Sequence, residues 1–279
     1  MKKTTLFTIF IFLILEIGTS GCLLNDSNSF EPDNFTKTAT ISENNTTLTM
    51  LFDEDFNSDF RWELTMETED VLKIAADEKI PTDKASQGIG KHQWIFEGNE
   101  KGITVLKFEY IRSGNRYTPE IYTYMIKNTE GELEILSFTS LSGNRTDNRP
   151  YTEGISVSED KTLLTLDGQC VSSTGAGNNH WYLEKSQTDM LEIINQTSNH
   201  YETDPGYGWH SWEMKGQNSG DITLTMNYVN ENLGNWIGIG LISEIVCDVY
   251  INENNKISIR KISYNSVKGE PVPYWDESL

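Results

Sequence analysis

The sequence predicts an all-β protein, in which two tandem β-sandwich domains follow a signal peptide and a polar tether. Short runs of β-branched and aromatic residues are separated by Gly, Asn and Asp throughout the chain. One stretch recurs at a spacing of about 118 residues, which is too long for a solenoid repeat and indicates two copies of one domain. The hydrophobic content of 37% in 279 residues suits two thin sandwiches better than one large core.

The amino terminus predicts export. Lys2 and Lys3 precede an apolar run over residues 6–17, and small residues lead to Cys22. The Ser-Gly-Cys order resembles a prokaryotic lipobox, which implies cleavage after residue 21 and a lipid on Cys22. We therefore expect a signal peptide over 1–21 and a protein anchored on the outer side of the cell membrane. The alternative is ordinary cleavage and secretion, with Cys22 as a bystander.

The rest of the chain divides by composition. Residues 22–44 are rich in Asn, Ser, Asp and Thr and predict a tether. We expect one sandwich over 45–138, a second over 155–265 and a C-terminal tail over 266–279. The polar link between the sandwiches predicts hinge freedom between them.

The repeat consists of two aligned blocks. Residues 62–74 match 181–193 and residues 88–110 match 206–228, with 13 identities in 36 positions. Each copy keeps two tryptophans, which we expect to anchor its core. The first copy has Trp62 and Trp94, and the second has Trp181 and Trp212.

Short strands in units of about 100 residues are typical of an immunoglobulin-like sandwich. In this interpretation only residues 70–77 are a candidate for a helical turn. The strands are expected at 47–52, 93–96, 105–110 and 120–126 in copy one, and at 162–166, 222–228 and 242–251 in copy two.

The order of landmarks in copy one resembles the chagasin-type inhibitors of papain-like cysteine proteases. Gly88, Gly90 and Lys91, followed by an aromatic strand, are similar to that family's GxGG loop without its last Gly. Arg112 stands where the family's RPW loop begins, although Ser113 and Gly114 replace the Pro and Trp. Residues 55–60 occupy the place of the NPTTG loop without its Pro, Thr or Gly.

Copy two departs from the family pattern in other ways. The echo of the first loop is Ser173-Thr174-Gly175, and that of the second is Gly206, Gly208 and Trp209. Asn230 stands where the Arg of the third loop would be. The resemblance implies that three loops at one end of a rigid sandwich block a protease cleft.

Electrostatics favours copy two as the inhibitor. Asp53, Glu54, Asp55 and Asp59 make the first loop of copy one acidic, which would oppose the thiolate of a cysteine protease. The alternative function is a non-catalytic envelope binding or structural module that kept the fold and lost inhibition. No nucleophile elbow is present, so we expect no enzyme.

Charge and cysteines exclude further classes. Against 22 Lys and Arg, 42 Asp and Glu give a net charge of −20, which argues against a nucleic-acid partner. The histidine spacings match no metal-ligand motif, and we expect neither metal nor cofactor. Cys170 and Cys247 both lie in copy two of an exported chain, so we expect a disulfide between them, with two buried thiols as the alternative.

Overall fold

The structure is a computed structural model that describes residues 35–82, 88–112, 120–142, 153–171, 179–200, 207–230 and 241–266. All regular structure in these residues is β-strand, so the predicted all-β class is confirmed. The strands of the first half are β1 (Phe35–Ile41), β2 (Thr47–Asp55), β3 (Phe60–Met66), β4 (Leu72–Pro81), β5 (Ile89–Gly98), β6 (Gly102–Arg112), β7 (Glu120–Thr129) and β8 (Glu132–Ser142). Those of the second half are β9 (Glu153–Val157), β10 (Leu163–Val171), β11 (Asn179–Lys185), β12 (Leu191–His200), β13 (Tyr207–Gly216), β14 (Gly220–Asn230), β15 (Leu241–Ile251) and β16 (Ile257–Ser266).

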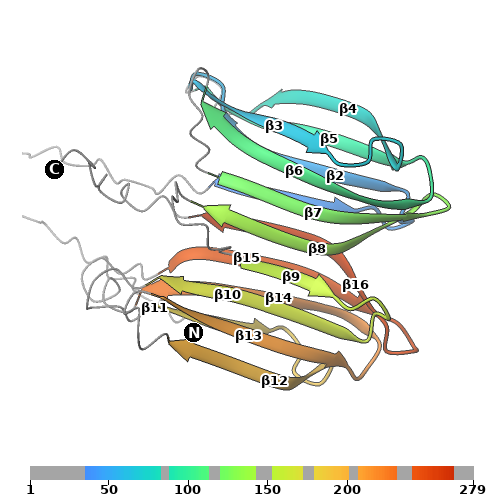
Figure 1. The fold of residues 1–279 in the computed structure, drawn as a ribbon, viewed down its shortest axis with the longest axis vertical. Coiled ribbons are helices and arrows are strands. Elements are labelled where there is room, and N and C mark those ends of the chain that lie inside the picture. The colour runs from blue at the N-terminus through green and yellow to red at the C-terminus, as the bar shows by residue number, and fades with distance from the viewer. Residues whose placement is uncertain are drawn as a thin grey trace, which may run out of the picture. The chain divides into compact units, whose positions relative to one another are not determined.

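The strands form the two antiparallel layers of a β-sandwich (Figure 1). One layer has the order β3-β6-β7-β8-β9-β10-β13-β12, and the other has the order β11-β14-β15-β16-β1-β2-β5-β4. A single bridge between Ile135 and Ile259 joins β8 to β16. Each layer therefore contains four strands from each half of the chain.

Alternating side chains place the core between the layers. Along β2 buried and partly exposed residues alternate, so that Leu48, Met50 and Phe52 point inward. The ring of Phe52 meets the ring of Trp62 edge to face at 5.0 Å. Trp94 is 2% exposed, and the other repeated tryptophans are equally enclosed, which confirms them as core anchors.

In the second half, the residue that packs against the first repeated tryptophan is Gly168, where the first half has Phe52. Phe52 pairs with His92 in the first half, and Gly168 pairs with His210 at the matching register. A Cβ on Gly168 would lie 2.7 Å from the indole of Trp181, so the indole occupies the space beside this position. A small residue on one layer thus compensates for a large one on the other.

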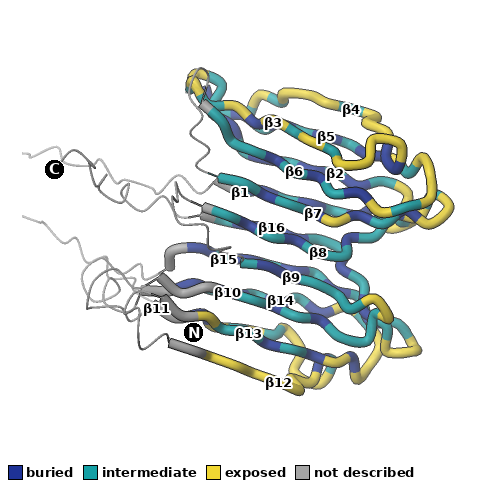
Figure 2. The backbone as a smooth tube through the Cα atoms, in the orientation of Figure 1, coloured by how far each residue is buried: buried dark blue, intermediate teal, exposed yellow. Residues whose placement is uncertain are grey.

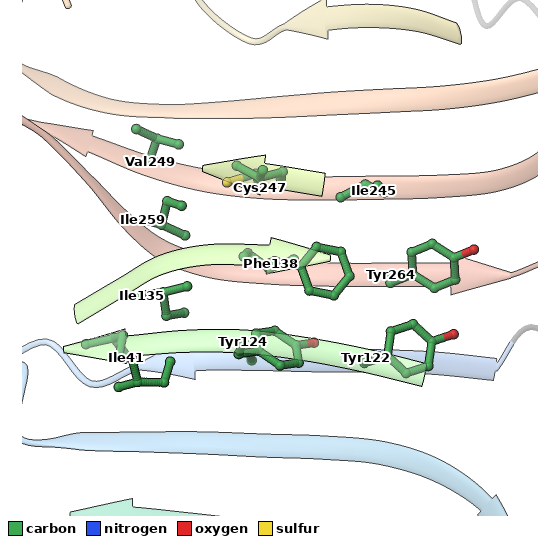
Figure 3. Packing of buried hydrophobic residues seen from close by; sticks show 14 of the residues in the cluster. Ile41, Tyr122, Tyr124, Ile135, Phe138, Ile245, Cys247, Val249, Ile259 and Tyr264 are labelled. Carbon is green, nitrogen blue, oxygen red and sulfur yellow. The ribbon is translucent and has the colours of Figure 1, made fainter. Parts of the chain in front are cut away.

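The two halves share one core instead of forming two hinged sandwiches. β9 of the second half pairs with β8, and β1 of the first half pairs with β16. Residues 32–279 accordingly form one compact unit. Figure 3 shows the shared region, where Tyr122 and Phe138 from the first half lie beside Tyr264 from the second. Hinge freedom at the link is therefore wrong, because both layers run continuously across it.

Two local predictions also change. The tether was expected to reach residue 44, but Phe35–Ile41 is strand β1, hydrogen-bonded on both sides. Residues 72–81 form strand β4 instead of a helical turn, because they pair with β5 along their whole length. β4 and β12 are sheet edges and are largely exposed (Figure 2). Charged residues and Pro81 on β4 protect such an edge from pairing with other chains.

Candidate functional site

The strand order brings seven strand-to-strand connections to one end of the sandwich, which we call the loop end. Here β2, β4 and β6 end and β3, β5 and β7 begin, as the pairs Asp55–Ile89, Pro81–Gly90 and Phe60–Arg112 show. The equivalent strands of the second half end at the same side, because β8 and β9 pair at Ser140 and Glu153. β1 begins at the loop end and β16 ends there, since Phe35 pairs with Ser266.

The first connection, residues 56–59, is fixed to the second by its backbone. The N–H of Phe56 donates to the carbonyl oxygen of Gly88 at 2.8 Å. Gly88 has a φ of 81°, and a Cβ there would lie 2.0 Å from Nδ2 of Asn57. A Cβ on Gly90 would lie 2.2 Å from the ring of Phe56. Both glycines are buried, so their role is to seat residues 56–59, and they are not exposed tips.

The same connection is also held from within and from β3 and β6. The carboxylate of Asp55 accepts the N–H of Asn57 at 2.9 Å, and Oγ of Ser58 accepts the N–H of Phe60 at 3.1 Å. The rings of Phe60 and Tyr110 are stacked at 5.3 Å. Burial raises the pKa of Tyr110 to about 12, so its hydroxyl stays neutral. Residues 56–59 are therefore ordered by contacts on two sides.

Most of the acidity expected here is neutralised within the protein. A carboxylate oxygen of Asp53 lies 2.6 Å from Nζ of Lys91. The candidate partner-binding residue Lys91 therefore forms an ion pair within the protein. Glu54 is 1% exposed and lies 2.9 Å from Nζ of Lys79 and 3.1 Å from Nδ1 of His92. Burial alone would raise the pKa of Glu54, but the hydrogen bonds from His92 and Lys79 outweigh it and lower the pKa.

His92 connects this buried charge to the edge strand. Its Nε2 lies 2.7 Å from the carboxylate of Asp77 on β4, and its ring stacks on Trp94 at 3.7 Å. Both ring nitrogens therefore lie within ion-pair distance of a carboxylate, one from β2 and one from β4. Asp55 caps a turn, because its carboxylate accepts the N–H of Asn57. The charge argument against copy one therefore loses most of its basis.

The remaining predicted residues occupy strand ends at the loop end. Arg112 pairs with Phe60 through its backbone, and Asn230 pairs with Asn179. Gly208 lies near the start of β13, and the side chain of Trp209 is 46% exposed. Ser173, Thr174, Gly175 and Gly206 lie outside the described residues, as do Cys22 and the segments 1–21 and 267–279.

The predicted disulfide is not formed in this structure. Cys247 is a free thiol and is 1% exposed. Along its own layer, Cys247 pairs with Leu224. On the opposite layer, Gly168 lies against Trp181, and Trp181 pairs with Tyr228, four residues further along β14 toward the loop end. Cys170 lies two residues beyond Gly168 toward the loop end, so the two cysteines sit at different levels of the sandwich.

The inward position of Glu54 is the feature that sequence reasoning missed. It continues the alternation of Leu48, Met50 and Phe52, so its place in β2 could have identified it as a core-facing carboxylate in need of a cation. Among the described residues, no group of His, Cys, Asp or Glu is arranged to hold a metal ion. No helix in the described part of the chain is long and apolar enough to cross a membrane.

A comparison with known families gives a match within the first half of the chain. Searches of curated proteins and of solved structures give no match. The matching family model is that of the chagasin family peptidase inhibitor I42, over residues 42–127, which include β2 to β6 and most of β7. This is a family of inhibitors and not of enzymes, in agreement with the non-catalytic role that the sequence predicts. The match falls on the copy that charge disfavoured, and it confirms that residues 42–127 carry the chagasin-type inhibitor pattern.

Proposed function

We propose that the protein inhibits papain-like cysteine proteases by inserting connections of its loop end into the active-site cleft. The observation that carries this proposal is the family match over 42–127 together with the fixing of residues 56–59 at that end. Inhibition of this kind needs no chemistry from the inhibitor, because a rigid wedge only has to exclude the substrate. The second half is proposed to be a divergent copy of the same domain.

Preorganisation is the physical basis of such binding. Residues 56–59 are already held by Gly88, Asp55 and Phe60, so little conformational entropy remains to be lost when a partner is contacted. Asn57 and Asp59 are the exposed residues of this connection. They are the described residues that a protease would meet first.

The proposed location is outside the cell membrane. The signal-like start and Cys22 support export and a lipid anchor. The tether enters the sandwich at Phe35, which is at the loop end. The partner would therefore be a protease of the envelope or of the surroundings of the cell.

Inhibition kinetics with papain test the proposal. The mature chain is titrated into papain and, as a control, into a serine protease, with a fluorogenic substrate for each. We expect competitive inhibition of papain and none of the serine protease. The inhibition constant should be the same whether or not the inhibitor has been preincubated with reductant. Full papain activity at micromolar concentrations of the folded protein would overturn the proposal and leave the envelope module as the function.

A further inference from the structure

A pocket of about 260 Å³ lies where the two halves meet, at the end of the sandwich opposite the loop end. Its lining comes from β1, β7, β8 and the β1–β2 turn of the first half, and from β16 and the β9–β10 turn of the second. The buried residues Ile41, Leu133 and Ile259 form its apolar part. Figure 3 shows Ile41 and Ile259 on the side of the shared core away from Tyr122 and Tyr264. We call this cavity the junction pocket.

The backbone around the junction pocket is held in the same way in both halves. Asn45 in the β1–β2 turn and Lys161 in the β9–β10 turn occupy the same place, with φ values of 59° and 61°. The carbonyl oxygen of Asn45 accepts the N–H of Leu133 at 2.6 Å. The carbonyl oxygen of Lys161 accepts the N–H of Ile257 at 2.8 Å. The two turns are therefore structural equivalents, and each is fixed to the start of a neighbouring strand.

The equivalent positions carry different side chains. The shared turn has Asn45 in one half and Lys161 in the other. β8 and β16 also share a β-bulge, because the pairing skips Leu136 in β8 and Arg260 in β16. A bulge redirects the side chain that it carries, and here it carries an apolar residue in one half and a guanidinium in the other. Neither the turn nor the bulge therefore requires a basic residue, so the positive charges at the pocket need another explanation.

The charged lining of the junction pocket is positive overall. It consists of three basic and two acidic residues, a net charge of +1, namely Lys127, Lys161, Arg260, Glu132 and Glu134. Nζ of Lys161 lies 2.7 Å from a carboxylate oxygen of Glu134. Nη1 of Arg260 donates to the amide oxygen of Asn45, which is a neutral partner. None of the ion pairs among the described residues involves Lys127 or Arg260.

These features select a small anion with a single charge. The planar guanidinium of an arginine has five N–H donors and matches the geometry of a carboxylate. The chain carries a net charge of −20, but its distant charges are screened beyond about 8 Å at physiological ionic strength, so the pocket lining decides which ion binds. A monocarboxylate neutralises the lining, whereas a phosphate dianion would reverse its charge. At ~30 Å³ per water the pocket holds about nine water molecules, which is the size of a short organic acid.

We propose that the junction pocket binds a small monocarboxylate. Its carboxylate lies against Arg260 and Lys127, and its short hydrocarbon part lies against Ile41, Leu133 and Ile259. The inference does not depend on the proposed function, since the pocket is at the opposite end of the sandwich from the loop end. Because both halves supply the lining, the ligand binds only the folded chain and stabilises it by mass action.

Sodium butyrate is the probe for the first part of the test. It is titrated into the mature chain at constant ionic strength, and binding is followed by isothermal titration calorimetry and by thermal unfolding. We expect one saturable site with a Kd of about 1 mM and a Tm that rises with butyrate concentration. Butylamine hydrochloride, which has the same hydrocarbon chain with a positive charge, should not bind. Absence of saturable butyrate binding at about 10 mM, or tighter binding of inorganic phosphate than of butyrate, would overturn the inference.

Charge-removing variants locate the binding in the second part. We expect Arg260→Gln and Lys127→Gln each to weaken butyrate binding about tenfold or more, as expected for the loss of a charged partner. Lys73→Gln is the matched control, because Lys73 is exposed on β4 and does not line the pocket. Lys127→Gln breaks no ion pair among the described residues, so it remains informative if Arg260→Gln destabilises the fold. Unchanged butyrate affinity in Lys127→Gln and in folded Arg260→Gln would overturn the inference.

Discussion

At the scale of single residues, the buried carboxylate of Glu54 controls how the loop end is held. It faces Lys79 and His92, and His92 in turn faces Asp77 on the edge strand. A buried charge pair of this kind contributes little net stability, but the removal of one partner leaves the others uncompensated. The network therefore couples β2, β4 and β5 beneath residues 56–59.

The first prediction concerns Glu54→Gln. The pKa of Glu54 is lowered in the folded state, so its contribution is present above its ordinary value of 4.5 and is lost as the pH falls through the folded value. We expect the variant to lose about 3 kcal/mol of stability at neutral pH and to show a weaker loss on acidification than the natural chain. Urea unfolding between neutral and acidic pH measures both quantities. Parallel pH profiles for the two proteins would contradict this account.

The second prediction concerns Cys247. Burial, with a smaller contribution from Asp248, raises the pKa of its thiol, so the reactive thiolate is suppressed in the folded protein. We expect iodoacetamide to modify Cys247 only after denaturation, as peptide mass spectrometry would show. A cross-linked peptide containing Cys170 and Cys247, found in a digest without reductant, would contradict the free thiol and support the disulfide.

At the scale of elements, the conformation of the connection 56–59 depends on Gly88, which the sequence analysis predicts to contact a partner. The family resemblance identifies Gly88 as part of a partner-binding loop, whereas the structure places it under Asn57 with a φ of 81°. Residue identity at this position is thus imposed by packing as well as by backbone conformation.

The third prediction compares two glycines with positive φ. Gly88→Ala forces a Cβ to 2.0 Å from Asn57, whereas Gly131→Ala, with a φ of 95°, meets nothing within 4 Å. Both changes carry the left-handed penalty of about 1 kcal/mol. We expect Gly88→Ala to weaken papain inhibition about tenfold or more, because it displaces residues 56–59 and tenfold corresponds to about 1.4 kcal/mol. Equal inhibition constants for both variants would show that these residues do not bind the protease.

Short runs of β-branched and aromatic residues correctly predicted strands that pair within one half of the chain. The expected runs at 47–52, 105–110 and 120–126 lie within β2, β6 and β7. The elements assigned to the tether or the link were instead strands at the junction. β1 pairs with β16 over two hundred residues away in sequence, and β9 pairs with β8 across the link. Such pairing depends on tertiary context that a sequence window does not contain.

At the scale of the whole molecule, continuous layers make the two halves interdependent. Ile135 on β8 and Ile259 on β16 are 0% and 2% exposed and form the bridge between the layers. A side chain removed here is lost from both halves at once. The protein should therefore unfold as one cooperative unit, although its length would allow two.

The fourth prediction tests this cooperativity with Ile259→Ala. Deletion of a buried isoleucine side chain costs about 2–5 kcal/mol, since the close-packed surroundings relax only partly. We expect scanning calorimetry to show a single transition in both proteins, shifted to lower temperature in the variant, with equal calorimetric and van't Hoff enthalpies. Phe108→Leu, which alters a side chain buried wholly within the first half, is the matched control and should shift the same single transition. A variant that splits into two transitions would mean that the halves are separate domains and that the strand pairs β8–β9 and β1–β16 do not couple their unfolding.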